Sequence, residues 1–165
     1  MIDRAELRAR YEEWVERIGR DHGAANNRVN GHAWFSPLAK PLAQSTVALV
    51  TTAGAHLDDQ EPFNTATSHG DPTIRTIPAD VDSARLRFAH THYDTASAED
   101  DPNVVLPIDR VHELVAAGRI GASAPFHIGM MGFNPDPSRV ADEAGPLVAR
   151  LLMEAGVDAV VLVPG

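Results

Sequence analysis

The stretch Gly156-Val157-Asp158-Ala159-Val160-Val161-Leu162-Val163 decides the fold. A helical pattern covers residues 138–155 just before it, and Gly156 is expected to end that helix. The run after it is short, apolar and rich in β-branched residues, which is typical of a strand buried on both faces. A helix, a glycine and a buried strand make up half of a βαβ unit. Pro146 lies inside the helical pattern and predicts a kink or the start of a second helical segment.

A second buried-strand signal covers residues 46–52, and a turn is expected over residues 53–56. Further along, the patterns predict candidate strands at 73–77 and 82–89, a helix at 107–117, and short-stranded or irregular chain at 120–131. We therefore expect an α/β fold, Rossmann-like and three-layered, with a parallel or mixed sheet and helices on both faces, incomplete at the C-terminus. The expected domains are an N-terminal helix (residues 3–18) and connector within 1–34, then an α/β domain over 35–165, truncated at its C-terminal side.

The composition narrows the class of partner. The chain has 165 residues, a net charge of −9, no cysteine and no cluster of basic residues. This argues against nucleic acid and against an anionic membrane surface as partners. No apolar run approaches the roughly 20 residues of a membrane helix, and the charged N-terminal residues do not resemble a signal peptide. We expect a cytoplasmic protein.

Candidate functional residues follow the predicted strands. Gly54 and His56 lie after the strand at 46–52, at the edge where open parallel sheets collect ligands. His90, His92 and Asp94 form an H-x-H-x-D cluster after the candidate strand at 82–89. In an extended chain these three side chains point to the same side, where they could bind a metal, shuttle protons or hold a substrate amine or carboxylate. A hydrogen-bonded structural loop is the alternative.

His127 is a further candidate, although a lone histidine between Phe126 and Ile128 is more often structural. A nucleotide-binding fingerprint is not expected, because the single glycine at Gly54 does not give the G-x-G-x-x-G pattern.

Several stretches, in order along the chain, together resemble the selenoprotein B family of the glycine, sarcosine, betaine and D-proline reductases. The first stretch runs from Phe35-Ser36-Pro37-Leu38 through Val47-Ala48-Leu49-Val50-Thr51-Thr52-Ala53-Gly54-Ala55-His56-Leu57, and the second is Gly70-Asp71-Pro72-Thr73-Ile74-Arg75 with Ile77-Pro78. The third is His90-Thr91-His92-Tyr93-Asp94, followed by Asp101, Asn103-Val104-Val105 and Pro107-Ile108-Asp109-Arg110. The fourth runs from Gly156 to Pro164.

The resemblance implies an oxidoreductase that cleaves the C–N bond of a small amino acid or amine derivative, with thiols as the redox partner. In the family, a strand like residues 157–163 leads into a loop carrying selenocysteine or cysteine, so that residue is expected directly after Gly165. One hypothesis is that Gly165 precedes an unread UGA selenocysteine codon; a cloned fragment is the rival explanation. The chain alone is then expected to be inactive.

The resemblance also implies that a pyruvoyl cofactor sits on a partner subunit, in a homo- or hetero-oligomer, with no cofactor inside this chain. His56, His90, His92 and Asp94 are then the candidate catalytic residues, and Gly54 and His127 the candidate substrate contacts.

Two other functions stay open. A metal-dependent hydrolase could use His90, His92 and Asp94, but Thr95 stands where the metallo-β-lactamase pattern H-x-H-x-D-H has its last histidine. A non-catalytic α/β module that binds a ligand or a partner protein is the other alternative.

Overall fold

The computed structural model describes residues 36–90 and 93–165. Nearly all of these belong to one compact unit, Pro37–Gly165. The predicted helix at 3–18, most of the predicted connector and His92 lie outside the described residues. The predicted domain division after residue 34 therefore stays a prediction.

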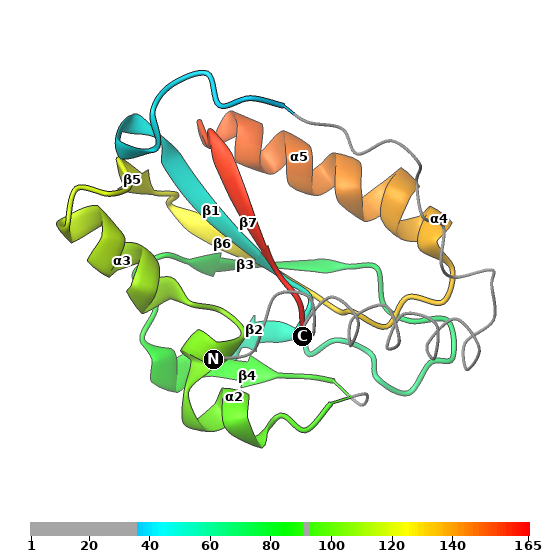
Figure 1. Cartoon of the computed structure of the whole chain (residues 1–165). Coiled ribbons are helices and arrows are strands. Elements are labelled where there is room, and N and C mark those ends of the chain that lie inside the picture. Colours follow the sequence, from blue (N-terminus) through cyan, green and yellow to red (C-terminus); the bar gives the residue numbers. More distant parts are fainter. Residues whose placement is uncertain (1–35, 91–92) are drawn as a thin grey trace, which may run out of the picture. The chain divides into compact units, whose positions relative to one another are not determined.

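A mixed sheet forms the centre of this unit (Figure 1). Strand β1 (Thr46–Thr51) pairs in parallel with β7 (Ala159–Val163) along one edge. Along its other edge it pairs in parallel with β5 (Ala122–Ser123) and then β6 (Phe126–Met130). Strand β3 (Ile74–Pro78) runs antiparallel to β6. The predicted strands at 46–52, 73–77 and 157–163 are thus confirmed, and β5 and β6 occupy the stretch predicted as short-stranded or irregular.

Alternate side chains of β1 face helices on opposite sides of the sheet. Ala48 and Val50 belong to an apolar cluster with residues of α5 (Gly145–Glu154). Leu49 belongs to a second cluster, with residues of α3 (Ile108–Ala116). Burial on both faces explains why the sequence of β1 is almost continuously apolar. The prediction of an α/β fold with a mixed sheet is confirmed at this level.

The predicted helix over residues 138–155 is interrupted at its beginning. It consists of α4 (Pro137–Arg139), a π-helical turn η4 (Val140–Ala144) and then α5. Pro146 lies in the first turn of α5, where its missing N–H leaves no hydrogen bond broken within that helix. The expected discontinuity near Pro146 therefore takes the form of a widened turn before it.

A small second sheet joins β2 (Ala55–Leu57) to β4 (Leu86–Phe88) in antiparallel register. The turn predicted over residues 53–56 was therefore too long, because pairing with β4 makes Ala55 and His56 extended. The strand predicted at 82–89 was also too long. Its first part is the 3-10 turn η2 (Ser83–Arg85), which Asp82 caps by accepting a hydrogen bond from the Ala84 N–H.

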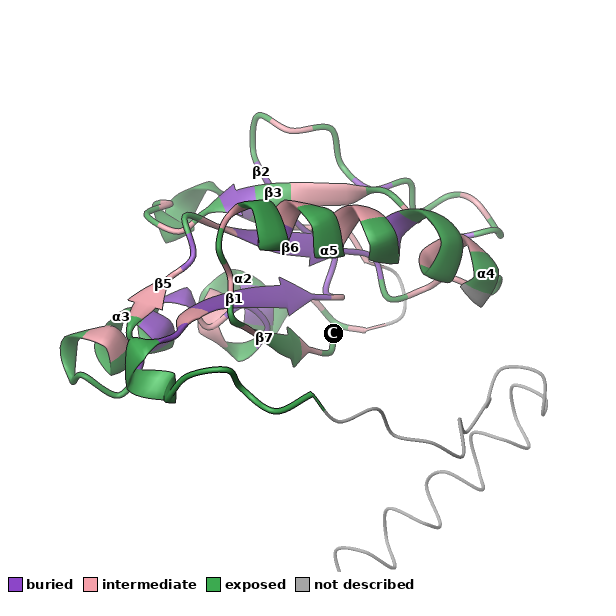
Figure 2. Ribbon diagram, turned by 90° about the horizontal axis from the view of Figure 1, so that it is seen from above, coloured by how far each residue is buried: buried purple, intermediate pink, exposed green. Residues whose placement is uncertain are grey.

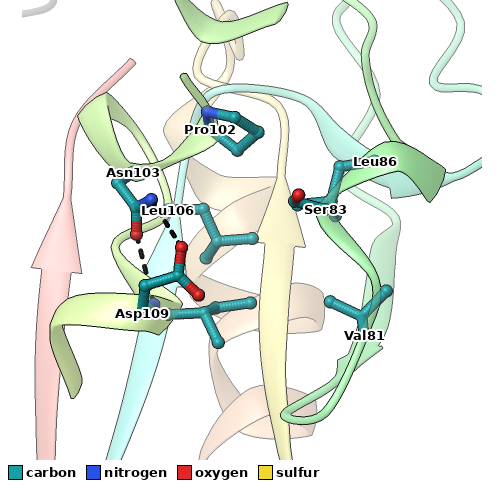
Figure 3. A pocket seen from close by; sticks show the side chains of 8 residues that line it. Val81, Ser83, Leu86, Pro102, Asn103, Leu106 and Asp109 are labelled. Atoms are coloured by element: carbon teal, nitrogen blue, oxygen red, sulfur yellow. Dashed lines mark hydrogen bonds between the residues drawn. The ribbon is translucent and has the colours of Figure 1, made fainter. Parts of the chain in front are cut away.

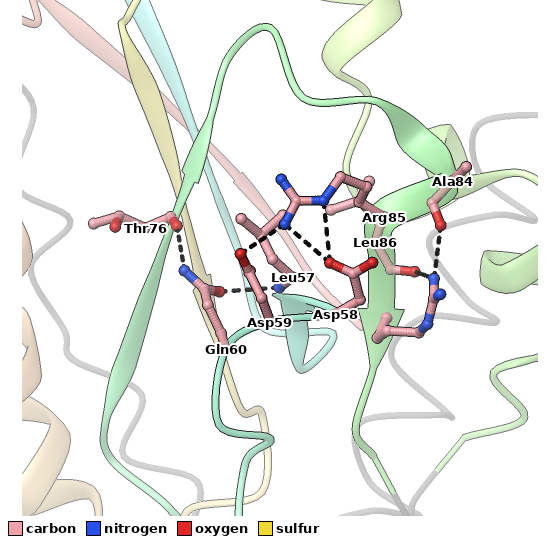
Figure 4. A network of polar contacts seen from close by, with 9 residues as sticks. Leu57, Asp58, Asp59, Gln60, Thr76, Ala84, Arg85 and Leu86 are labelled. Atoms are coloured by element: carbon pink, nitrogen blue, oxygen red, sulfur yellow. Dashed lines mark hydrogen bonds and ion pairs between the residues drawn. The ribbon is translucent and has the colours of Figure 1, made fainter.

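Polar side chains fix this small sheet in place (Figure 4). The guanidinium of Arg85 contacts the carboxylates of Asp58, at 3.0 Å, and Asp59, at 2.7 Å. These hydrogen bonds raise the pKa of Arg85. The amide of Gln60 accepts from the backbone of β2 and donates to the backbone of β3, each at 2.9 Å. The small sheet is thereby tied to the central one.

Short helical elements complete the unit: η1 (Leu42–Gln44), α2 (Ala96–Asp100) and η3 (Pro102–Val104). The helix predicted at 107–117 is confirmed as α3, and Gly118 follows it with a φ of +66°. Across residues 36–90 and 93–165, no helix combines the length and the apolar character that crossing a membrane requires.

Candidate functional site

The C-terminal ends of the parallel strands β1, β6 and β7 meet at one edge of the sheet. The backbone N–H of Thr52 donates to the Val163 carbonyl at 3.1 Å, and the N–H of Gly165 donates to Thr52 Oγ1 at 3.1 Å. The N–H of Gly54 donates to the Met130 carbonyl at 2.8 Å. This is the edge at which open α/β sheets bind ligands.

Gly54 allows a second chain segment to approach this edge closely. Its φ is +72°, a left-handed conformation that side chains disfavour, and a Cβ here would overlap the backbone carbonyl of Ala89. The Ala89 N–H donates to the Gly54 carbonyl at 3.0 Å. This contact brings the following residue, His90, to the strand ends. The predicted role of Gly54 as a substrate contact stays a prediction.

His90 and Tyr93 form the side-chain part of the site. Their half-buried rings are 4.7 Å apart between centroids and tilted by 48°. The Tyr93 hydroxyl donates to the Ala53 carbonyl at 2.9 Å. Burial, and to a lesser extent Glu99, raises the pKa of Tyr93, so the hydroxyl keeps its proton for this bond. A Cβ on Gly132 would lie 3.1 Å from the Thr52 carbonyl oxygen and 3.4 Å from His90 Nε2, so the glycine lets the backbone pass close to both groups.

The sequence analysis missed three parts of this arrangement: Thr52, Tyr93 and Gly132. Thr52 directly follows β1, so its position at the strand end was a usable signal. Tyr93 lies inside the H-x-H-x-D cluster, but the pattern indicated only His90, His92 and Asp94 as site residues. Gly132 had no local signal, because its relevance depends on packing against a distant segment.

Asp94 has a local structural role. Its carboxylate accepts a hydrogen bond from the N–H of Ala96, the first residue of α2, at 3.0 Å. No group of three or more histidine, aspartate or glutamate side chains within residues 36–90 and 93–165 is placed to hold a metal ion. Because His92 lies outside those residues, the proposed metal set of His90, His92 and Asp94 stays a prediction.

His56 lies on β2 and is almost fully buried. Its Nδ1 is 3.0 Å from the Gly54 carbonyl oxygen, and its ring meets Phe63 edge-on at 6.1 Å between centroids. Phe63 in turn stacks under the guanidinium of Arg75, at 4.5 Å. His56 thus holds the backbone at Gly54 in place through its contact with the Gly54 carbonyl oxygen. Its predicted catalytic role is not tested by this arrangement.

His127 lies on β6 and is completely buried. Its Nδ1 accepts the backbone N–H of Leu49 at 3.1 Å. Desolvation, with a smaller effect of His112, lowers its pKa to about 4, so the ring is neutral at pH 7. The structure places His127 in the core between the sheet and α3, and its role as a substrate contact stays a prediction.

Three hollows on the described part of the chain lie away from these residues. The pocket in Figure 3 has a volume of about 10 Å³, barely enough for one water molecule. Beside it, the Asn103 amide donates to the Asp109 carboxylate at 2.9 Å and accepts its N–H at 3.2 Å. Two open hollows, of about 460 and 430 Å³, lie against the two ends of β3. None of the three is lined by a candidate site residue.

Comparison with known proteins identifies the lineage. The profile of the glycine/sarcosine/betaine reductase selenoprotein B family matches residues 30–164. The chain is 41% identical over 131 residues to the D-proline reductase subunit gamma of Acetoanaerobium sticklandii, covering 79% of this chain and 53% of that protein. It is 32% identical over 130 residues to the glycine reductase complex component B subunit gamma of Carboxydothermus hydrogenoformans, covering 77% of this chain and 29% of that protein.

A betaine reductase complex component B subunit beta of Peptoclostridium acidaminophilum is 27% identical over 126 residues, covering 74% of this chain and 28% of that protein. The chain therefore spans about half, or less, of the length of these relatives. No solved structure matches it. The hydrolase and the binding module are not favoured by these relationships. The chain belongs to the glycine/sarcosine/betaine reductase selenoprotein B family.

Proposed function

We propose that this chain supplies the N-terminal α/β part of a reductase B subunit that cleaves the C–N bond of a small amino acid or amine derivative. Its active edge would be formed by the ends of β1, β6 and β7 with His90 and Tyr93. The redox-active selenocysteine or cysteine would follow Gly165. A Rossmann-like completion of the sheet and a cytoplasmic location are parts of the same proposal.

The position of Gly165 carries this proposal. Its N–H bonds to Thr52 Oγ1, and a Cβ on Gly165 would overlap Ala53, so the backbone of this residue lies directly against the end of β1. A residue attached there would lie near Ala53, whose carbonyl accepts the hydrogen bond from Tyr93.

The residues of this chain would prepare the site for that side chain. His90 would hold or transfer a proton at its Nε2, which lies beside Gly132. Tyr93 would position both His90, by ring contact, and the Ala53 carbonyl, by its hydrogen bond. His92, Asp94 and His56 remain proposed acid, base or substrate-binding groups, and Gly54 and His127 proposed substrate contacts.

The cofactors belong outside the described residues. A selenolate or thiolate would supply the nucleophile. No residue of this chain is proposed to form a pyruvoyl group, so that carbonyl would come from a partner subunit. Hetero-oligomer formation is plausible because the relatives are named as subunits or components of reductase complexes.

A chimera tests the proposal. The segment of the A. sticklandii D-proline reductase gamma subunit that aligns with this chain is replaced by this chain's matching residues, and the other subunits of that complex are added. D-proline reduction by dithiothreitol is then measured, with native mass spectrometry as the check on assembly. We expect measurable reduction, which falls at least about 100-fold in the His90→Gln variant because proton transfer is lost.

His112→Gln is the matched control, because His112 is an exposed histidine on α3. It should change the rate less than about twofold, as surface substitutions usually do. A chimera that assembles but does not reduce D-proline contradicts the proposed function. Equal effects of the two histidine variants contradict the role of His90.

A further inference from the structure

Strand β7 exposes apolar side chains on both faces of the sheet (Figure 2). Val160 and Leu162 pair with residues of β1 that face α5, yet they are 42% and 75% exposed. Val161 pairs with Leu49, which faces α3, yet it is 47% exposed. None of these three β7 side chains belongs to either apolar cluster of the described core. Both helical layers therefore stop short of β7.

The backbone of β7 is also open on one side. Within the described part of the chain, β7 pairs with β1 and with no other strand. Exposed edge strands are usually protected by charges, proline or a bulge, and residues 159–163 contain no charge and no proline. The nearby charge of Asp158 is already bound to Lys40, at 2.8 Å, and to the Thr46 N–H, at 2.8 Å. An apolar, unprotected edge of this kind is a template for another strand.

We propose that the β7 edge binds the polypeptide equivalent to the second half of the longer family members, which adds a strand to β7 and helices over Val161 and Leu162. This inference rests on the proposed function. The family profile matches up to residue 164, at the end of β7, and the A. sticklandii relative is matched over only 53% of its length. That relative thus contains further chain nearly as long as the matched part, and the open edge is where this sheet could accept it.

A second copy of this chain fits the surface less well. Pairing two β7 strands across a twofold axis would satisfy the backbone edge. The helices α3 and α5 stop short of β7 in each copy, so Val161 and Leu162 would stay largely uncovered on the two faces. A segment with an α/β alternation, by contrast, brings its own covering helices.

The test uses the full chain and, as a separate polypeptide, the part of the A. sticklandii D-proline reductase gamma subunit that follows its matched segment. Every cysteine or selenocysteine in that probe is replaced by serine, so that no disulfide can form. Hydrogen–deuterium exchange is measured for residues 159–163, and affinity by titration. We expect the exchange of the β7 amides that do not bond to β1 to slow at least about tenfold in the complex.

Two exposed residues give a matched pair of variants: Leu162, which is 75% exposed on β7, and Met153, which is 76% exposed on α5. Leu162→Lys should weaken binding of the probe at least about tenfold, because a lysine cannot be covered by an apolar layer. Met153→Lys should leave the affinity within about twofold. Equal effects of the two variants, or no binding of the probe, would overturn the proposal.

Protection, in the chain alone, of the β7 amides that do not bond to β1 would also overturn it. Protection that grows with concentration, together with a doubled native mass, would assign the edge to a second copy. Protection that disappears when residues 1–29 are removed would assign it to the N-terminal segment. The D-proline chimera separates the two proposals: an active chimera with an unprotected β7 removes only the edge inference, and an inactive, assembled chimera with a protected β7 removes only the proposed function.

Discussion

The buried imidazole of His127 should make the stability of this protein depend on pH. Its Nδ1 accepts the Leu49 N–H at 3.1 Å, so the proton of the neutral ring is on Nε2. Nε2 is buried and has no hydrogen-bond partner among the described residues. Protonation of the ring would place a charge in the core and break the bond to Leu49. Burial accordingly lowers the pKa to about 4.

The size of the effect follows from the two pKa values. An unfolded histidine has a pKa of about 6.5, so between about pH 6.5 and pH 4 the unfolded chain binds a proton that the folded chain does not. The contribution to stability is complete above about pH 6.5 and is lost as the pH falls toward 4. At about 1.4 kcal/mol for each pH unit, the loss is about 3 kcal/mol.

The assay is urea unfolding at several values between about pH 7 and pH 4, for the wild type and His127→Asn. Asparagine retains a non-titrating acceptor for the Leu49 N–H. The other ionisable groups titrate alike in both proteins, so their effects cancel in the difference. We expect the wild type to lose about 3 kcal/mol more than the variant over this range. Parallel pH profiles for the two proteins would refute the reasoning.

Three further outcomes are expected. Tyr93→Phe should lower the free energy of unfolding by about 1–2 kcal/mol, because the buried Ala53 carbonyl loses its donor; an unchanged urea midpoint would contradict that bond. Gly129→Ala should lower the free energy of unfolding by about 3 kcal/mol, because the new Cβ would overlap the Ala55 carbonyl. Gly118→Ala should lower it by about 1 kcal/mol, because the space around Gly118 is open and only its left-handed backbone disfavours a side chain. The reverse order of the two losses in urea unfolding would contradict this packing. Removal of metals with EDTA should leave the Tm unchanged, whereas a fall in Tm would indicate a metal site and support the hydrolase alternative.

The sequence predicted the elements whose signals are local. The apolar runs of β1 and β7 and the helical spacing of α3 were recognised because each fits one period of one element. β2 was missed because it is three residues long and becomes extended through pairing with β4. β6 was uncertain because it contains His127 and Gly129, which are not typical strand residues. Both are explained only by contacts with distant strands: His127 accepts the Leu49 N–H of β1, and Gly129 leaves room for the Ala55 carbonyl of β2.

The site was predicted in part for the same reason. The sequence indicated His90 and the end of β1, because catalytic groups gather where parallel strands end. It could not show that Tyr93 bonds to Ala53 or that Gly132 faces His90, because these contacts join segments about 40 residues apart. The hydrogen bond between Asp94 and the Ala96 N–H did have a local signal, because an aspartate often bonds to the backbone two residues on, but the apparent H-x-H-x-D cluster outweighed it.

The proposed function requires a redox-active residue that follows Gly165 and lies at the strand ends around Thr52, Ala53 and His90. Sequencing the gene from the Gly165 codon onward tests this requirement. We expect a UGA or cysteine codon directly after Gly165, with an open frame beyond it that encodes further cysteines. Any other codon at that position, or a stop codon other than UGA with no continuing frame, would contradict the account.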